Sequence, residues 1–261
     1  MANKSSHGLY QKILFVVILM LIWETIARAG IFNPAVFPSV TSIGKSFING
    51  LANGLLIQKT ANSLYLIFKG LLIALFLSVI LSSLAIMSNL MENLVDVLNS
   101  MLHPLPGIAL LPVAILWFGI GEASILFIII HSVLWPMVVN LRSGFRSVQP
   151  IYLDIGRNIG LHGFPLLWRV MVPASLPFFH SGVKIAWARA WRSVIAAEMV
   201  FGAASGTAGG LGWHIYMTRY MFDISGTFAA LLVIIFVGIA VEELVFKTIE
   251  KYTVIKWGMT I

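Results

Sequence analysis

The chain has 261 residues, of which 59% are hydrophobic and only 10% are charged, and its mean hydropathy is +0.94. Because a soluble globular domain carries about a quarter charged residues, this composition excludes the ordinary soluble classes and predicts an integral membrane protein. The net charge of +7 does not indicate a nucleic-acid partner, since Lys and Arg cluster at the ends of apolar runs, as membrane topology requires. Cysteine is absent, which excludes disulfides and thiolate metal sites.

Six apolar runs are candidates for membrane spans, each of which needs about 20 residues to cross a hydrocarbon layer of about 30 Å. We expect all of them to be helices, because an open strand would leave backbone groups unpaired in lipid. The third run reaches full length only with an amphipathic stretch, and Pro104 and Pro106 predict a break after it. The sequence thus predicts an all-α membrane protein with one transmembrane domain over residues 1–261, with spans at 13–29, 64–87, 90–120, 123–141, 178–201 and 228–246.

A polar, basic segment at residues 153–177 separates the fourth run from the fifth. It is too long for a turn and too charged to lie in hydrocarbon, so we expect it to meet a soluble partner. A short helix over residues 153–159 is predicted to end near Gly160, because glycine adopts the left-handed backbone that such an end requires. Pro165, Pro173 and Pro177 are expected to limit further helix and to keep the segment a compact elbow.

The distribution of Lys and Arg predicts the orientation, because cytoplasmic loops carry the excess of these residues. The bias favours both termini, and with them segment 153–177, on the cytoplasmic side. The predicted inner residues are Lys4, Lys12, Arg142, Arg146, Arg157, Arg169, Lys184, Lys247, Lys251 and Lys256; the predicted outer residues are Arg28, Lys45, Lys59, Lys69 and Arg219.

Two glycine-containing stretches could suggest a phosphate site, and both are better explained otherwise. Residues 202–212 read GAASGTAGGLG between membrane helices, which favours a flexible external connection. Gly44, Lys45 and Ser46 resemble the end of a P-loop, but Ser39 occupies the place of its first glycine and the stretch is predicted outside the membrane. We therefore expect no nucleotide site, and no ATP or Mg²⁺, on this chain.

Three charged residues in the fifth run need an explanation: Arg189, Arg192 and Glu198. Placing a guanidinium at the bilayer centre costs roughly several kcal/mol or more, unless the group is paired or faces water. One hypothesis is that Arg192 and Arg189, three residues apart on one helix face, offer an electrostatic station to an anionic substrate. The alternative is that the arginines pair with Glu198, Glu122 or backbone carbonyls and hold the helices together.

Catalytic and metal chemistry have little support in the sequence. His103, His131 and His180 lack the paired spacing of a metal site, so we interpret them as helix-packing residues. Clustered His, Asp or Ser residues at catalytic spacing are missing from the spans, which argues against a membrane-embedded enzyme. An ion-gradient-driven carrier of a small organic anion stays open as an alternative, although internal repeats with matching interrupted helices, which such carriers usually show, are not detected.

Segment 153–177 resembles the E-A-A-x3-G-x9-I-x-L-P signature of ABC importer permeases. Asp154, Ile155 and Gly156 stand in the place of E-A-A, Gly160 follows at the right spacing, and Val170, Val172 and Pro173 close the pattern. Ile155 departs from it, since a small residue is usual there, so packing against the partner is expected to differ. Further blocks are similar to the nitrate, sulfonate and taurine branch of this family: residues 37–39 (FPS), 104–124, 187–203 and 250–258.

This resemblance implies an importer permease fold with a cytoplasmic coupling helix and a place in a bacterial inner membrane. It implies two separate ATPase subunits, which bind ATP and Mg²⁺, a second permease chain, and an external substrate-binding protein. Six spans give too little wall for a gated path, so we expect a homodimer with the path along its two-fold axis. The implied substrate is a small anion such as a sulfonate, taurine or nitrate. The residues expected to couple to the ATPase are Asp154, Gly156, Arg157, Gly160, Leu161 and Pro173.

Overall fold

The computed structural model describes residues 3–201 and 209–256, and this part of the chain is helical throughout, without a strand. Most of the predicted glycine-rich stretch, residues 202–208, lies outside the described residues. Because lipid offers no partner to backbone N–H and C=O groups, a chain this apolar satisfies them within helices. The fold class predicted from the sequence, an all-α membrane protein, is confirmed.

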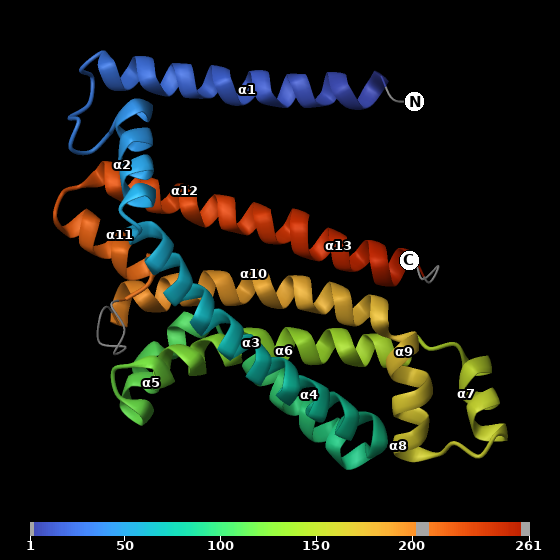
Figure 1. Ribbon diagram of the computed structural model, residues 1–261. Helices are drawn as coiled ribbons and strands as arrows, with labels where there is room; N and C mark the ends of the chain where they lie inside the picture. The colour runs from blue at the N-terminus through green and yellow to red at the C-terminus, as the bar shows by residue number, and fades with distance from the viewer. Residues whose placement is uncertain (1–2, 202–208, 257–261) are drawn as a thin grey trace.

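Most of the long helices run roughly parallel to one another and one crosses them obliquely, with short helices at both ends of the molecule (Figure 1). They are, in chain order, α1 (Asn3–Arg28), α2 (Val40–Ala52), α3 (Leu55–Met87), α4 (Asn89–Leu102), η1 (Gly107–Leu110), α5 (Leu111–Phe118), α6 (Glu122–Arg146), α7 (Pro150–Asn158), α8 (Gly163–Leu166), η2 (Leu167–Met171), α9 (Val172–Ala174), α10 (Leu176–Phe201), α11 (Leu211–Tyr220), α12 (Ile224–Ala240), η4 (Val241–Phe246), α13 (Lys247–Glu250) and η5 (Lys251–Ile255).

Helix α6 is the centre of the bundle and packs most extensively against α10 and α3. Its fully buried residues include Ile125, Ile128 and Ile129, which join the main apolar cluster together with residues of α3, α10 and α11. A second cluster around Met137 and Leu167 connects the other end of α6 to η2. The core therefore continues from the bundle into the elbow that follows α6.

Four helical segments of the described chain are long and apolar enough to cross a membrane: Tyr10–Arg28, Leu55–Met87, Glu122–Arg146 and Ile224–Thr253. A fifth is added if α4 and the η1–α5 unit form one broken span, since they meet at an angle of 89°. The break predicted at Pro104 and Pro106 is thus present. Helix α10 has 26 residues but carries four charged ones, so the count of six spans stays a prediction that this structure allows.

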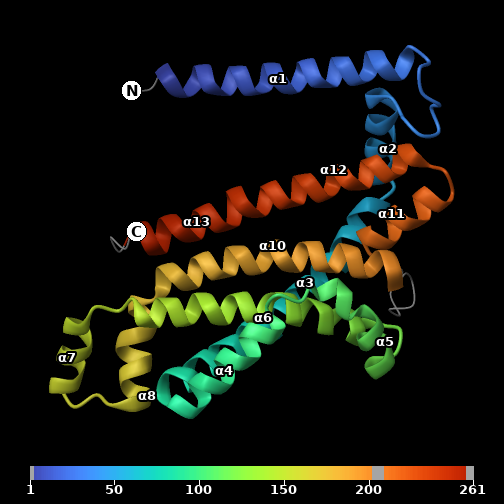
Figure 2. The same cartoon turned by 180° about the vertical axis from the view of Figure 1, so that it is seen from behind.

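The start of α1 and the end of the C-terminal helix lie at the same end of the molecule as α7, α8 and α9, whereas α2, α5 and α11 lie at the opposite end (Figures 1 and 2). Figure 2, the view from behind, shows the same division. The chain therefore has an elbow end and an opposite end.

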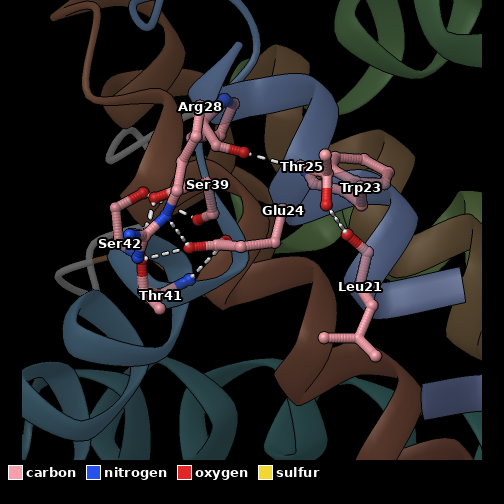
Figure 3. Close-up of polar contacts among 9 residues, drawn as sticks. Leu21, Trp23, Glu24, Thr25, Arg28, Ser39, Thr41 and Ser42 are labelled. Carbon is pink, nitrogen blue, oxygen red and sulfur yellow. Dashed lines mark hydrogen bonds and ion pairs between the residues drawn. The ribbon is translucent and has the colours of Figure 1, made fainter. Parts of the chain in front are cut away.

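Helix α1 stands apart from the bundle: none of the residues from Tyr10 to Arg28 is buried. A polar joint at its end attaches it to α2 (Figure 3). The carboxylate of Glu24 accepts hydrogen bonds from the Arg28 Nε (2.6 Å) and from the hydroxyl (2.9 Å) and the backbone N–H (3.2 Å) of Thr41. Trp23 donates from Nε1 to the Pro38 carbonyl (2.9 Å) and stacks on Phe37, with ring centroids 4.6 Å apart. The FPS block of the sequence is therefore the connection that holds α1.

Candidate coupling segment and translocation pathway

Helix α7 begins at Pro150, where a missing N–H costs nothing, and ends in a Schellman motif. The N–H of Leu161 donates to the Gly156 carbonyl (2.9 Å), and the N–H of Gly160 donates to the Arg157 carbonyl (2.9 Å). Gly160 has φ +85°, in the left-handed region. The end of the helix predicted at Gly160 is confirmed, and the helix starts three residues earlier than predicted.

Gly156 holds α7 against the next turns of the elbow. A Cβ at this position would lie 2.6 Å from Leu166 Cδ1 and 3.2 Å from Val170 Cγ2, so a larger residue would require these side chains to shift. Leu161, the residue after the left-handed glycine, comes back over the same spot, with its Cδ1 3.9 Å from that Cβ position. Gly156 and Leu161 thus contribute to the packing of α7 against the rest of the elbow.

The three prolines of the elbow were expected to limit further helix, but the chain remains helical around them, apart from the turn at Ser175. Pro165 lies in α8, Pro173 in α9 and Pro177 at the second residue of α10, and η2 between them is a π-helical turn. Pro165 lies in the first turn of α8, where a backbone N–H would have no partner inside the helix, whereas Pro173 directly follows helical residues and Pro177 follows them after the turn at Ser175. The path from residue 163 onward is therefore a chain of short helical pieces leading directly into α10.

Apolar and charged side chains are both exposed on α7 and on the turns that follow it. Ile155 is 52% exposed and Ile159 is 71% exposed, and on α8 and η2 the rings of Phe164 and Trp168 are exposed and stacked, with centroids 6.3 Å apart. Asp154 and Arg157 form an exposed ion pair on the same helix, with Oδ1 and Nη1 3.3 Å apart. The elbow thus combines apolar side chains and charges in one exposed surface.

Ion pairs fasten the elbow end of the spans to one another. Arg142, buried near the end of α6, pairs with Asp96 and with Glu92 of α4 (3.2 Å to Glu92), and Arg146 also pairs with Glu92. On α10, Lys184 pairs with Glu242 of η4 (3.0 Å). These pairs join α6 to α4, and α10 to η4, at the end of the molecule where the elbow lies.

The two arginines of α10 open into a cavity at the break between α4 and η1. A cavity of about 330 Å³ is lined by Gly107, Ser132, Arg189, Arg192 and Ser193. A second cavity of about 470 Å³ shares Arg189 and extends toward Asn99, His103 and the two prolines of the break. Arg192 donates from Nε to the Ala188 carbonyl of its own helix (3.0 Å).

Glu198 lies apart from these arginines. It is 2% exposed, and its carboxylate accepts hydrogen bonds from the Ser63 hydroxyl (2.8 and 2.9 Å) and the Gly212 N–H (2.9 Å). Glu122 pairs with Lys69 of α3. Neither carboxylate forms an ion pair with Arg189 or Arg192 within residues 3–201 and 209–256, so the expected interhelical pairing is not found there.

Sequence reasoning missed the serines of the first cavity. The Ser193 hydroxyl donates to the Ser132 hydroxyl (2.8 Å), which joins α10 to α6 across 61 positions in the chain. Ser193 follows Arg192 directly, and Gly107 follows the Pro104–Pro106 break directly. For Ser193 and Gly107, the available signal in the sequence was that each lies next to a predicted feature.

Comparison with known proteins decides the family. The model of the family "binding-protein-dependent transport system inner membrane component" matches residues 70–252. The chain belongs to this family. It is therefore a multi-pass membrane permease subunit of an ABC transporter and not an enzyme, and membership implies ATPase and substrate-binding partners.

Three relatives illustrate the family. The taurine transport system permease protein TauC of Escherichia coli is 26% identical, over 89% of this chain and 82% of its own. The formylaminopyrimidine transport permease protein ThiX of Halalkalibacterium halodurans is 31% identical, over 90% and 92%. The bicarbonate transport system permease protein CmpB of Synechococcus elongatus is 28% identical, over 72% and 65%. These names differ in substrate, so similarity alone does not assign one here.

Proposed function

We propose that this chain forms the translocation path of an ATP-driven importer for a small anionic solute, such as a sulfonate, taurine or nitrate, delivered by an external binding protein. The observation that carries the anion class is the pair of arginines that opens into a cavity at the break of α4. An unpaired guanidinium in a membrane helix is tolerated where it faces water or a ligand. The two carboxylates expected as possible partners, Glu198 and Glu122, are instead bound to Ser63, Gly212 and Lys69, which supports the assignment.

The proposed power stroke enters at the elbow. We expect two ATPase subunits to bind the surface of α7 through Asp154, Arg157 and the exposed apolar side chains beside them. Because Gly156, Gly160 and Leu161 fix the shape of the elbow and Pro173 lies directly before α10, closure of the ATPases would move the elbow as a rigid body and rock the attached spans. ATP and Mg²⁺ would be held by those partners.

The assembly we propose is a homodimer in a bacterial inner membrane, with the path between the two copies. The start of α1, the end of the C-terminal helix and the elbow share one end of the molecule (Figure 1). If the ATPases bind the elbow, that end is cytoplasmic and both termini are cytoplasmic, as the Lys and Arg distribution predicts.

The substrate class is tested on the cognate binding protein, because a ligand that binds the folded state raises the melting temperature. Taurine, methanesulfonate, nitrate and a neutral pyrimidine would each be titrated against the purified binding protein. We expect an anion or sulfonate to raise its melting temperature. Stabilisation by the neutral pyrimidine alone would contradict the proposed substrate class while leaving the permease assignment intact.

A further inference from the structure

The break between α4 and η1 brings polar groups of three separate elements to one small cavity. Gly107 is the first residue after the break, Ser132 lies in the middle of α6, and Arg189, Arg192 and Ser193 lie in the middle of α10. Backbone that leaves the helical path at membrane depth is tolerated where it lines a cavity. The break between α4 and η1 is therefore explained by its place in the wall of this cavity.

Gly107 allows the break to approach α6 closely. A Cβ at this position would overlap the Ser132 hydroxyl and would lie 3.2 Å from the Ile128 carbonyl. A larger residue would have to push the break away from α6 or displace Ser132. The width of the cavity thus depends on the absence of a side chain at Gly107.

The hydrogen-bond donors of the cavity are only partly used. The Ser193 hydroxyl donates to Ser132, so the Ser132 hydroxyl accepts this bond and keeps its own hydrogen for another acceptor. Arg192 uses Nε for the Ala188 carbonyl, which leaves the terminal amino groups of its guanidinium. Within the described residues, Arg189 and Arg192 form no ion pair. The lining contains no acidic side chain, so the cavity carries positive charge and donors.

We propose that Arg189, Arg192, Ser132 and Ser193 form a binding site for the oxyanion head group of the transported solute, which enters or leaves it past Arg189 through the neighbouring cavity. This inference rests on the proposed function and specifies its site. Guanidinium groups match carboxylate, sulfonate and nitrate because their N–H groups fit pairs of oxygen atoms. A cavity of about 330 Å³ accommodates a small head group together with some water. Arg189, shared by both cavities, would remain in contact with the anion during its passage.

The test uses the absence of cysteine from the chain. Ser193→Cys places a single thiol in the cavity, and Ala52→Cys places one on the exposed end of α2 as a control. Both variants are prepared as the complete importer, with its ATPase subunits, in detergent. Each thiol is allowed to react with methanethiosulfonate reagents that carry either a sulfonate or a trimethylammonium group, and the two rates are measured.

We expect the ratio of sulfonate to trimethylammonium rates to be about tenfold higher for Ser193→Cys than for Ala52→Cys, because positive charge concentrates anions in a cavity. Arg192→Gln in the Ser193→Cys background should lower the ratio toward the control. Sodium methanesulfonate or sodium nitrate should slow the labelling of the Ser193→Cys thiol more than sodium chloride at the same ionic strength. These measurements need neither ATP hydrolysis nor uptake, so their failure would not touch the importer assignment.

Three results would overturn the site. The first is a rate ratio for Ser193→Cys equal to that for Ala52→Cys, or no labelling by either reagent. The second is a ratio unchanged by Arg192→Gln, or unchanged by Arg189→Gln if the Arg192 variant does not assemble. The third is equal protection by chloride and by the oxyanions, which would show a site that recognises charge without oxygen acceptors.

Discussion

Charged residues of both signs lie on α10, and the structure accommodates them in opposite ways. Glu198 is fully enclosed and accepts hydrogen bonds from α3 and from the start of α11. Arg189 and Arg192, earlier on the same helix, open into a cavity and form no ion pair among the described residues. The comparison teaches that a charge in an apolar helix does not reveal its role by itself. The groups that a charged side chain contacts indicate whether it serves helix packing or faces a possible substrate path.

The largest expected effect is on folding, from Glu198→Ala. This change leaves the Ser63 hydroxyl and the Gly212 N–H buried without their acceptor and opens a void, at a cost of about 2–5 kcal/mol. We expect a lower unfolding temperature of the purified permease in detergent and less monodisperse protein. Glu198→Gln keeps one acceptor oxygen, so its unfolding temperature should fall less than that of Glu198→Ala. If Glu198→Ala unfolds like the wild type but no longer supports uptake, Glu198 belongs with the arginines.

Arg192→Gln should affect transport and leave folding unchanged. A hydrogen bond to a charged group contributes about 1.5–3 kcal/mol, so uptake into proteoliposomes driven by ATP should fall about 10- to 100-fold. The unfolding temperature should stay at the wild-type value. Lys45→Gln removes an exposed positive charge elsewhere and should leave uptake unchanged. An equal loss of assembly and uptake in Arg192→Gln would instead assign this arginine to packing.

Gly156→Val should act on coupling. Its Cβ would meet Leu166 Cδ1 at 2.6 Å and would push α7 from its place, at a cost of about 1–3 kcal/mol of overpacking. We expect ATP hydrolysis to lose its stimulation by the binding protein, while the Ser193→Cys thiol keeps its preference for the anionic reagent. Gly44→Val on α2, where a Cβ meets no atom within 4 Å, is the matched control. Normal stimulation in Gly156→Val would show that the shape of the elbow does not matter for coupling.

The smallest expected effect comes from Asp154→Asn, because its ion pair with Arg157 is exposed and such pairs contribute little to stability. The unfolding temperature of the permease should not change. If Asp154 contacts the ATPase, the affinity between the two subunits should fall about two- to fivefold and depend on salt concentration. A changed unfolding temperature with an unchanged affinity would assign Asp154 to the elbow itself.

The sequence predicted the end of α7 because the geometry there is local. The left-handed Gly160 ends a helix only a few residues long, and the contacts of Gly156 reach no farther than Val170. The break at Pro104 and Pro106 was predictable for the same reason: the absence of a backbone donor acts within one turn.

The partners of the intramembrane charges could not be predicted in this way. Ser63 and Glu198 are 135 positions apart, and the packing of α3 against α10 alone determines that they meet. The same holds for Lys69 and Glu122, which are 53 positions apart. With these contacts unknown, the sequence placed Glu198 beside Arg189 and Arg192 because they share a helix, although the structure separates them.

The central claim, that an ATPase drives this permease through the elbow, is tested most directly by photo-crosslinking. A photoreactive amino acid replaces Ile155, whose side chain is 52% exposed on α7, or Tyr220, which is 72% exposed at the opposite end (Figure 1). In the intact importer, position 155 should form a product with the ATPase subunit and position 220 should not. An ATPase product from position 220, or none from position 155 in an intact complex, would contradict the account.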